Sequence, residues 1–325
     1  MNTAISTSTA AVIISFNPDL DLMQEILASL ARQCPVVIVD NGSSPSILSS
    51  LGELVEEMEY VELLALHNNE GIALAQNTGI KHISEDNTAI KYVLMLDHDS
   101  MPPGGMVTYL EKTFDKIEEQ GIPVAAVGPV LYDPRNNNLL KLHKMKHLFP
   151  GKIGPEKVTG QYPVVEVDGL NSSGTLISLK ALHIIGHFDS TLFIDHVETD
   201  WCFRARATGF KLFATTGTRL THHMGDDVCY YWFFGKKSMP YRSPSRHYYL
   251  ARNSLLLQKR KYIPASWKVS NILKLFFTYI YFGFLVNESA QQRKCILLGI
   301  RDGMKGITGR EPGNCSQTAL VPHKD

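Results

Sequence analysis

The chain has 325 residues, of which 44% are hydrophobic and 20% are charged, and its formal net charge is zero. These values are ordinary for a soluble globular protein with one large core or two domains. The cysteines are odd in number and form no Cys-x-x-Cys pair, which argues against a disulfide framework or a zinc site and for a reducing cytosol. They are Cys34, Cys202, Cys229, Cys295 and Cys315.

The charges are distributed unevenly along the chain. The first 227 residues carry 28 acidic and 16 basic side chains, a net charge of −12, whereas residues 228–287 carry ten basic side chains and no acidic one. Such asymmetry predicts that an anionic surface meets residues 228–287. A nucleic-acid-binding protein would use the same basic segment, but the acidic larger part argues against that alternative.

Residues 1–10 are rich in Ser, Thr and Ala and contain no basic stretch, which predicts a short frayed arm and not a signal peptide. Strands and helices are then predicted to alternate, with strands at residues 11–16, 36–39, 61–66 and 92–96 and helices at residues 19–32, 47–58 and 72–82. This alternation predicts a doubly wound, mostly parallel α/β sheet with right-handed crossovers.

The pattern loosens after residue 100. We predict helices at residues 107–120, 180–185 and 197–208, strands at 124–131, 164–167, 174–178 and 210–214, an extended stretch at 218–224, and loops at 134–163, with basic residues and histidines that include Lys146 and His147.

The last third has a different character, with a basic helix predicted at residues 244–261 and an apolar, aromatic helix at 266–287. The densest apolar stretch, residues 275–286, is shorter than the roughly 20 residues that a spanning helix needs. We therefore expect a helix lying on an anionic bilayer; a buried helix or an oligomer contact is the alternative.

Asp97 and Asp99 follow an apolar run that reads as a buried strand, residues 92–96. In an open α/β sheet, ligands bind beyond the carboxyl ends of the strands. Side chains two residues apart on an extended segment point the same way. One divalent cation can therefore meet both carboxylates, and Mg²⁺ or Mn²⁺ shares such a site with substrate phosphates.

Other strand ends of the predicted sheet also carry polar turns. Phe16 and Asn17 follow the first strand and Asp40 the second, where a nucleotide base and ribose would lie. After the third strand, Gly71 permits a close approach of the backbone to a ligand, and the next helix starts there. The spacing of a Walker A loop or a GxGxxG fingerprint is absent, which argues against ATPases and NAD-dependent dehydrogenases.

A second acidic cluster enters one predicted helix. Asp195 and Glu198 are three residues apart and are expected on one helix face, and Arg204 is spaced to pair with Asp200. A general base for an acceptor hydroxyl is the functional interpretation; acids favoured by the helix dipole are the alternative. His222, followed by His223 through Asp226, ends an extended segment and is suited to complete a metal shell or bind a phosphate.

Together these motifs resemble the inverting glycosyltransferases of family 2, which have the GT-A fold. The resemblance covers about residues 11–235, in the order Val-Ile-Ile-Ser-Phe-Asn-Pro, Val-Asp-Asn-Gly-Ser, Asn-x-Gly-Ile-Ala-x-Ala-Gln-Asn-x-Gly and Leu-Asp-x-Asp-Ser. The later motifs, including Ser-Pro-x-Arg-x-Tyr-Tyr-x-x-Arg-Asn at residues 243–253, are most similar to bacterial rhamnosyltransferases of cell-surface polysaccharide synthesis.

The resemblance implies roles for individual residues. Asp40 would recognise the base, Asp97 would hold the ribose or reach the metal through water, and Asp99 and His222 would bind Mg²⁺ or Mn²⁺. Glu198 aligns with the second acid of the family's Glu-Asp-x-Asp pattern and would be the base, with Asp195 as second choice. The remaining candidates are Phe16, Asn17, Asn69, Gly71 and Gln76 for the donor and Ser173, Gly174, Asp200, Trp201 and Arg204 for the acceptor side.

The resemblance also implies a reaction and a domain plan. We expect transfer of L-rhamnose from dTDP-L-rhamnose to a polyprenyl-diphosphate-linked glycan in O-antigen (lipopolysaccharide) or other polysaccharide synthesis, at the inner face of the bacterial inner membrane, with no nucleic acid involved. Another donor, such as UDP-galactofuranose or UDP-N-acetylglucosamine, is the enzymatic alternative. Expected parts are the arm 1–10, a GT-A domain 11–235 (donor half 11–100, acceptor half 101–235) and a membrane-associating helical extension 236–325.

Overall fold

The computed structural model describes residues 5–86, 88–135, 137–145, 150–160, 163–222, 227–232, 236–286, 289–313 and 315. His223 through Asp226, Lys146 and His147, which the sequence marked as candidates, lie outside these residues. The chain forms two compact units: unit 1 is Met1–Ser190 with Glu198–His223, and unit 2 is Thr191–Val197 with Met224–Asp325.

The first part of unit 1 alternates strands and helices as predicted. Its elements are β1 (Thr9–Ser15), α1 (Leu20–Leu30), β2 (Val36–Asp40), α2 (Pro45–Glu56), β3 (Val61–Ala65), α3 (Ile72–Asp86) and β4 (Tyr92–Asp97). The first strand starts at Thr9, two residues before the predicted start, because the chain is already paired with β4 there.

The middle of the chain holds more strands than the sequence predicted. Its elements are β5 (Ser100–Met101), α4 (Met106–Glu118), β6 (Val124–Asp133), β7 (Asn138–Leu139), β8 (Leu142–Met145), β9 (Pro150–Ile153), η1 (Pro155–Lys157), β10 (Val164–Val167), β11 (Leu176–Ser178), α5 (Leu179–Ile185), η2 (Ser190–Leu192), α6 (Val197–Ala207) and β12 (Lys211–His222). The loop-rich stretch 134–163 also contains short strands. One prediction was wrong, because the two extended stretches near residues 210–224 form the single strand β12.

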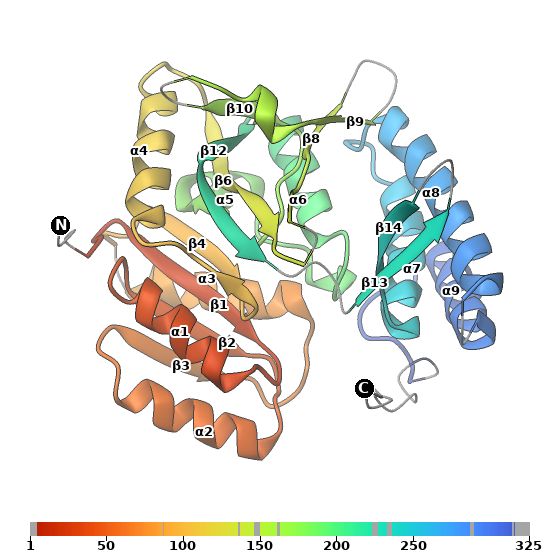
Figure 1. Cartoon of the computed structure of the whole chain (residues 1–325), viewed down its shortest axis with the longest axis horizontal. Helices are drawn as coiled ribbons and strands as arrows, with labels where there is room; N and C mark the ends of the chain where they lie inside the picture. The colour runs from red at the N-terminus through yellow and green to blue at the C-terminus, as the bar shows by residue number, and fades with distance from the viewer. Residues whose placement is uncertain are drawn as a thin grey trace. The chain divides into compact units, whose positions relative to one another are not determined.

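One mixed, mostly parallel sheet organises unit 1. Its strand order is β10-β12-β6-β11-β4-β1-β2-β3, and off this path β5 pairs with β12 and β7 with β6. Figure 1 labels most of these strands, among them β1, β4, β6 and β12. The pairs β4–β1, β1–β2, β2–β3 and β6–β12 are parallel, whereas β11 runs antiparallel between β4 and β6. The predicted α/β class, a mostly parallel sheet flanked by helices, is thereby confirmed.

Helices cover both faces of this sheet. Alternate strand residues such as Ile13 and Ile38 join the apolar faces of α1 and α4 in one buried cluster. On the other face α3 comes so close that a Cβ on Gly79 would lie 2.5 Å from Val12 Cγ1. Because both faces are buried there, the central strands β1, β2 and β4 are apolar along almost their whole length, as parallel strands in α/β proteins are.

Unit 2 consists of the paired strands β13 (Asp227–Trp232) and β14 (Lys236–Tyr241) and the helices α7 (Pro244–Gln258), α8 (Ala265–Phe284) and α9 (Ser289–Lys305). The sequence analysis predicted α7 and α8 but not α9. Close packing of α7 and α9 depends on glycine, since a Cβ on Gly303 would lie 2.6 Å from the carbonyl oxygen of Arg252. Within the described residues, no helix is long and apolar enough to cross a bilayer.

A disulfide joins Cys295 of α9 to Cys315. The prediction from the odd cysteine count was therefore wrong on this point, since two cysteines far apart in sequence are brought together by the fold. Cys34 and Cys202 are free and buried, and their burial raises the pKa of each thiol to about 12.

Candidate functional site

The two aspartates of the Asp-x-Asp motif lie where β4 ends. Five residues of β4 before Asp97 are buried, because β4 pairs with β1 on one side and β11 on the other. Asp97 ends the strand, and Asp99 precedes the short strand β5. Both carboxylates are only partly buried, so the sheet delivers them to its edge without sealing them inside.

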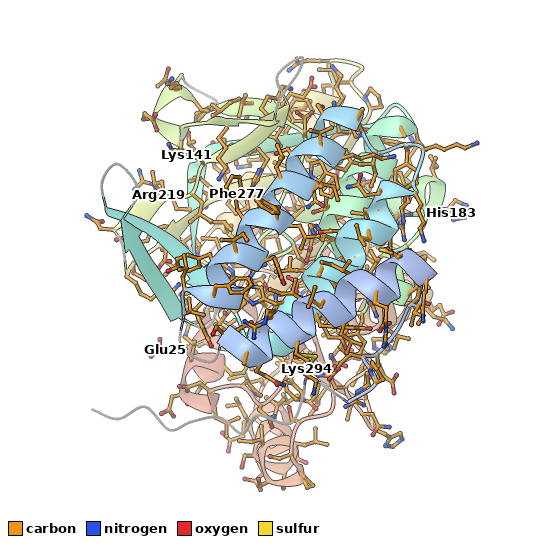
Figure 2. The ribbon with its side chains drawn as sticks, turned by 90° about the vertical axis from the view of Figure 1, so that its right-hand side faces the viewer. Glu25, Lys141, His183, Arg219, Phe277 and Lys294 are labelled. Atoms are coloured by element: carbon orange, nitrogen blue, oxygen red, sulfur yellow. A yellow bond between two sulfur atoms is a disulfide. The ribbon has the colours of Figure 1, made fainter. Side chains whose placement is uncertain are left out.

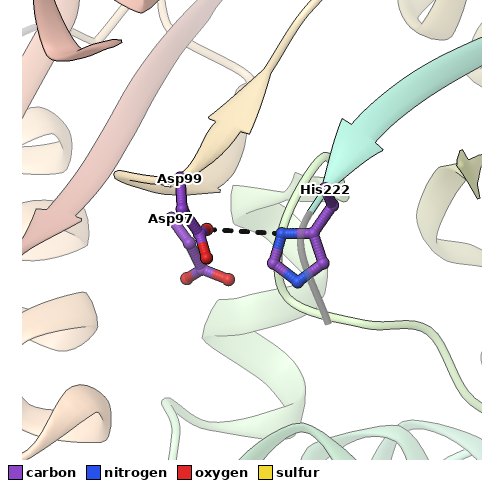
Figure 3. Close-up of side chains that lie close together, drawn as sticks. All are labelled: Asp97, Asp99 and His222. Carbon is purple, nitrogen blue, oxygen red and sulfur yellow. Dashed lines mark ion pairs between the residues drawn. The ribbon is translucent and has the colours of Figure 1, made fainter. Parts of the chain in front are cut away.

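His222 reaches the same place from the far end of β12. The short strand β5 pairs antiparallel with β12, and this pairing puts His222 opposite Ser100. Nδ1 of His222 lies 3.3 Å from Oδ1 of Asp99, as the dashed line in Figure 3 marks. One ligand atom from each of Asp97, Asp99 and His222 lies within 4.8 Å of the others.

Two buried serines form hydrogen bonds with residues of this cluster. The Ser173 hydroxyl donates to Ser100 Oγ at 2.6 Å, and Ser100 Oγ lies 2.7 Å from Nδ1 of His222. The backbone N–H of Asp97 in turn donates to Ser173 Oγ at 3.2 Å. Both serines are buried, so the network links β4, β5, β12 and the 168–175 loop through groups shielded from water. Ser173 was predicted on the acceptor side, whereas no role was predicted for Ser100, although it directly follows Asp99.

Asp99 and His222 each stabilise the charged form of the other. Burial alone would raise the pKa of the Asp99 carboxyl, but the hydrogen bond and the charge of His222 hold that pKa below its usual value. Burial likewise disfavours the charged imidazole, yet Asp99 and Asp97 raise the pKa of His222 above its usual value. The two carboxylates thus favour positive charge beside them, and the same field attracts a cation.

A divalent cation fits the cluster of Asp97, Asp99 and His222. The set offers two carboxylates, which are the ligand type of Mg²⁺ and Mn²⁺ sites, and one imidazole, which is a common ligand of transition metals. All three residues belong to unit 1. The converging ligand atoms and the negative field support a cation site but do not distinguish one metal from another.

Asp40, the residue expected to recognise the base, is buried at the end of β2. Its carboxylate accepts hydrogen bonds from Ser15 Oγ (3.0 Å), from the Ser43 backbone N–H (2.8 Å) and from the Ser43 hydroxyl. The neighbouring Asn17 has a φ of 45° and accepts from the Ser44 N–H. These bonds fix the turn, while Phe16 beside it is 43% exposed.

The loops after β2 and β3 touch each other. The side chain of Asn41 donates to Asn69 Oδ1 at 3.2 Å and accepts from the Glu70 N–H at 2.9 Å. Asn69 Oδ1 also accepts from the N–H of Gly71, whose φ of 88° suits a glycine. Gly42 must also be a glycine, since a Cβ there would lie 2.5 Å from the Asn68 carbonyl carbon. Asp40, Asn69 and Gly71 thus belong to one set of hydrogen-bonded turns at the carboxyl ends of β2 and β3, called the rim below.

Gln76 lies one turn further along α3 and is 1% exposed. Its Nε2 donates to Ser172 Oγ at 2.6 Å, and its Oε1 is buried without a hydrogen-bond partner among the described residues. Gln76 therefore joins α3 to the loop that carries Ser173. Gly174 of that loop has a φ of 80°, and a Cβ on it would lie 2.7 Å from Leu220.

Three candidates on α6 hold that helix in place within unit 1. Asp200 is fully buried and pairs with Arg204 at 2.9 Å, as the sequence analysis predicted. Arg204 also donates to the carbonyls of Ile185 and His187, and Trp201 Nε1 donates to the carbonyl of Gly186. Glu198, in the first turn of α6, is partly exposed.

Asp195 lies in unit 2, before α6 begins at Val197. The prediction that Asp195 and Glu198 share a helix face was wrong, because Asp195 has a φ of 64° and lies outside the helix. Its carboxylate accepts two hydrogen bonds from Arg246, at 2.8 and 2.9 Å, and Arg242 lies 3.7 Å away. Burial alone would raise the pKa of Asp195, but the two arginines lower it to about 2.

Known proteins resemble this chain both in sequence and in fold. The chain is 30% identical over 308 residues to the dTDP-rhamnosyl transferase RfbF of Shigella flexneri, which covers 92% of this chain and 96% of that protein. It is 23% identical over 191 residues to the poly-β-1,6-N-acetyl-D-glucosamine synthase of Staphylococcus aureus, of whose length it spans 43%.

Among solved structures, similar folds include GalNAc-T7 with UDP, GalNAc and Mn²⁺ (TM-score 0.57, 13% identity, 92% of this chain and 56% of that one). Another is residues 1–349 of S. aureus TarS with UDP-GlcNAc (TM-score 0.55, 13% identity, 92% and 81%). At these identities the likeness concerns the fold alone. The profile of glycosyl transferase family 2 matches residues 10–166. With a relative 30% identical over nearly its whole length, the chain belongs to glycosyl transferase family 2 and is a glycosyltransferase.

Proposed function

We propose that the protein transfers L-rhamnose from dTDP-L-rhamnose to a glycan carried on a polyprenyl diphosphate, in the synthesis of a cell-surface polysaccharide such as O-antigen. The observation that carries the proposal is the cluster of Asp97, Asp99 and His222 at the ends of sheet strands, in a chain 30% identical to a dTDP-rhamnosyl transferase over 92% of its length. The donor assignment rests on that relative.

Mg²⁺ or Mn²⁺ would be held by Asp97, Asp99 and His222. When bound, such an ion neutralises negative charge on the leaving nucleoside diphosphate. Ser100 and Ser173 orient the ligands through the hydrogen bonds described above, as outer groups do in metal sites.

Glu198 is the proposed general base. It would take the proton of an acceptor hydroxyl, whose oxygen forms a bond to the anomeric carbon on the face opposite the nucleotide. The bond from that carbon to the diphosphate oxygen breaks, and its electron pair leaves with the nucleoside diphosphate. One displacement inverts the anomeric configuration. Asp195 is less suited to this role, because its pKa near 2 and its two bonds to Arg246 make it a weak proton acceptor.

The rim of unit 1 around Asp40 is the proposed nucleoside site. Asp40 has an exposed fraction of 0% and would act by holding, through Ser15 and Ser43, the turn that forms this site. Phe16 and Asn17 would lie beside the base. Asn69 and Gly71 would approach the donor through the connected loops. Buried Gln76, Ser173, Asp200 and Trp201 are proposed to shape the site and not to touch substrate, with Arg204 and Gly174 in the same supporting role.

A membrane surface is the proposed partner of unit 2. The exposed large apolar residues of α8 are Val269, Ile272, Leu273, Phe276, Phe277, Ile280 and Phe284. At about 100° per residue they fall within an arc of about 140° on one side of the helix. Asn271 and Phe282, which are buried, fall on the opposite side.

The borders of this apolar arc are basic. Lys268 and Lys274 fall on its two sides, and no acidic residue occurs in residues 228–287. Figure 2 shows α8, with Phe277 labelled, and α9, with Lys294 labelled, on the face toward the viewer. An apolar stripe flanked by lysines is the pattern of helices that lie in the interface of an anionic bilayer. We propose peripheral binding at the cytoplasmic face of the inner membrane, where a lipid-linked acceptor would be met.

The experiment that tests the transfer reaction is a donor panel. Purified protein is given dTDP-L-rhamnose, UDP-galactofuranose or UDP-N-acetylglucosamine with Mn²⁺ or Mg²⁺ and a membrane lipid extract, and the release of nucleoside diphosphate is measured. We expect release from dTDP-L-rhamnose only. Release of nucleoside diphosphate from a UDP-sugar but not from dTDP-L-rhamnose would overturn the donor assignment, while the protein would still be a glycosyltransferase.

A further inference from the structure

The segment before α6 has an unusual backbone. Phe193, Asp195 and His196 each have a φ of 64°, in the left-handed region that side chains other than glycine rarely adopt. The Ile194 N–H donates to the Leu192 carbonyl at 2.8 Å, which makes a tight three-residue turn around Phe193. Three such residues within four positions persist only where the surroundings hold them.

Helix α7, which belongs to the same unit, hydrogen-bonds to the backbone of this segment. Nδ2 of Asn253, on α7, lies 2.8–2.9 Å from the carbonyl oxygens of Leu192, Ile194 and Asp195. Nη2 of Arg252 donates to the Leu192 carbonyl at 2.8 Å, and its Nε donates to Asn253 Oδ1 at 3.0 Å. Both side chains are completely buried, so these bonds are shielded from water.

The side chains of the segment are held by α7 as well. The ring of Phe193 stacks on Tyr249, with centroids 4.9 Å apart, and the Asp195 carboxylate is gripped by Arg246. Nε2 of His196 lies 3.2 Å from Ser254 Oγ. Every left-handed residue of the segment therefore has a partner on α7.

The segment leads directly into the proposed base. Val197 begins α6, and Glu198 is its second residue. Residues 192–196 are therefore the part of the chain that leads into the first turn of α6.

We propose that Asn253 and Arg252 are positioning residues, which keep residues 192–196 in the left-handed path that orients Glu198. This inference rests on the proposed role of Glu198 as the general base. Neither residue touches substrate in this proposal. Asn253 is the sharper case, because its single amide spans three carbonyls of the segment and its Oδ1 accepts from Arg252.

The test compares Asn253→Ala with Tyr248→Phe in the full-length protein. Tyr248→Phe removes a different buried hydrogen bond of α7, the 2.9 Å bond from its hydroxyl to Asp302, and keeps every hydrogen bond that Asn253 donates to the segment. For Asn253→Ala we expect kcat to fall about 100-fold, with the Kd of the nucleoside diphosphate and the KM of the donor unchanged. Tyr248→Phe should lower the melting temperature while leaving kcat near the wild-type value.

Amide hydrogen exchange supplies a readout that needs no turnover. In Asn253→Ala, amides of residues 192–198 should exchange faster, while those of β4 and β12 stay unchanged. Wild-type kcat and exchange in Asn253→Ala would overturn the inference, as would an equal loss of kcat in Tyr248→Phe at the same melting temperature. If Asn253→Ala shows faster exchange but the wild-type protein turns over no nucleotide sugar, the role of Asn253 in holding residues 192–196 is supported and the proposed function is rejected.

Discussion

His222 and Asp99 face each other across two paired strands, with Nδ1 of the imidazole 3.3 Å from Oδ1 of the carboxylate. They are 123 positions apart in the sequence, and the β5–β12 ladder brings them together by setting His222 opposite Ser100. The cluster thus depends on the register of a two-residue strand.

Removal of the supporting hydroxyl should weaken metal binding. In Ser100→Ala, His222 loses the oxygen 2.7 Å from its Nδ1, and the affinity for Mn²⁺ should fall about 10–100-fold. Titration of Mn²⁺ in the presence of nucleoside diphosphate measures this. Ser178→Ala, which removes the N-terminal cap of α5, is the control for a buried serine and should keep the wild-type affinity. Unchanged affinity in Ser100→Ala would show that Ser100 has no part in the site.

Glu198 and Asp195 should behave differently when neutralised. We expect Glu198→Gln to lower kcat by about 10²–10⁴-fold without changing donor binding, because a positioned base contributes that much. Asp195→Asn should instead lower the melting temperature, since Arg246 loses its carboxylate partner. Glu62→Gln, a change at an exposed residue of β3, is the control. Wild-type kcat in Glu198→Gln would move the base elsewhere.

The stability of unit 2 should fall in mildly acidic solution. Burial lowers the pKa values of His247 and His196 from 6.5 to about 4. Protons therefore bind the unfolded chain first, so the free energy of unfolding is fully present above pH 6.5 and is lost as the pH falls toward 4. His247 is 2% exposed. At about 1.36 kcal/mol per pKa unit, its protonation lowers the free energy of unfolding by about 3 kcal/mol.

Urea unfolding followed by circular dichroism at several pH values checks this expectation. His247→Gln cannot titrate and should flatten part of the loss between pH 6.5 and 4. Asp195, with its pKa lowered to about 2, should add a separate loss only below pH 4. A profile of His247→Gln parallel to that of the wild type would contradict the assignment to His247.

The disulfide should stabilise unit 2. It closes a loop with a sequence separation of 20, for which the chain-entropy relation predicts about 3 kcal/mol. Cys295→Ser should therefore lower the melting temperature measured without reductant, and dithiothreitol should cause no further decrease in that variant. Cys34→Ser, at a free buried thiol, is the control that should still respond to dithiothreitol. A peptide map without any 295–315 cross-link would contradict the pairing.

Membrane binding should depend on the apolar arc of α8. Phe276 and Phe277 are 57% and 67% exposed. The double variant Phe276→Ser/Phe277→Ser should bind vesicles containing phosphatidylglycerol at least about tenfold more weakly, because two large apolar side chains no longer enter the lipid. Ile184→Ser, 54% exposed on α5, is the control. Equal sedimentation of all three proteins with vesicles, or a concentration-dependent dimer lost in the double variant, would reject lipid as the partner.

Periodicity and turn chemistry were sufficient for the first hundred residues. The runs Ala11–Phe16 and Val36–Val39 are apolar because strands buried on both faces must be, and each was predicted within a few residues of its observed bounds. Helix α9 was not predicted, and the cysteine count misled because it carries no information on distance. A count cannot show that Cys295 and Cys315 meet.

The sequence by itself determined the alternating α/β pattern, the family motifs and the presence of carboxylates at strand ends, because these follow from local periodicity and residue order. Only the tertiary structure decided which distant groups meet. It paired β5 with β12 and so brought His222 to Asp99, and it turned Arg246 of the basic segment inward onto Asp195. Such pairings depend on strand register and on burial. They join groups 123 and 51 positions apart, so no short stretch of sequence specifies them.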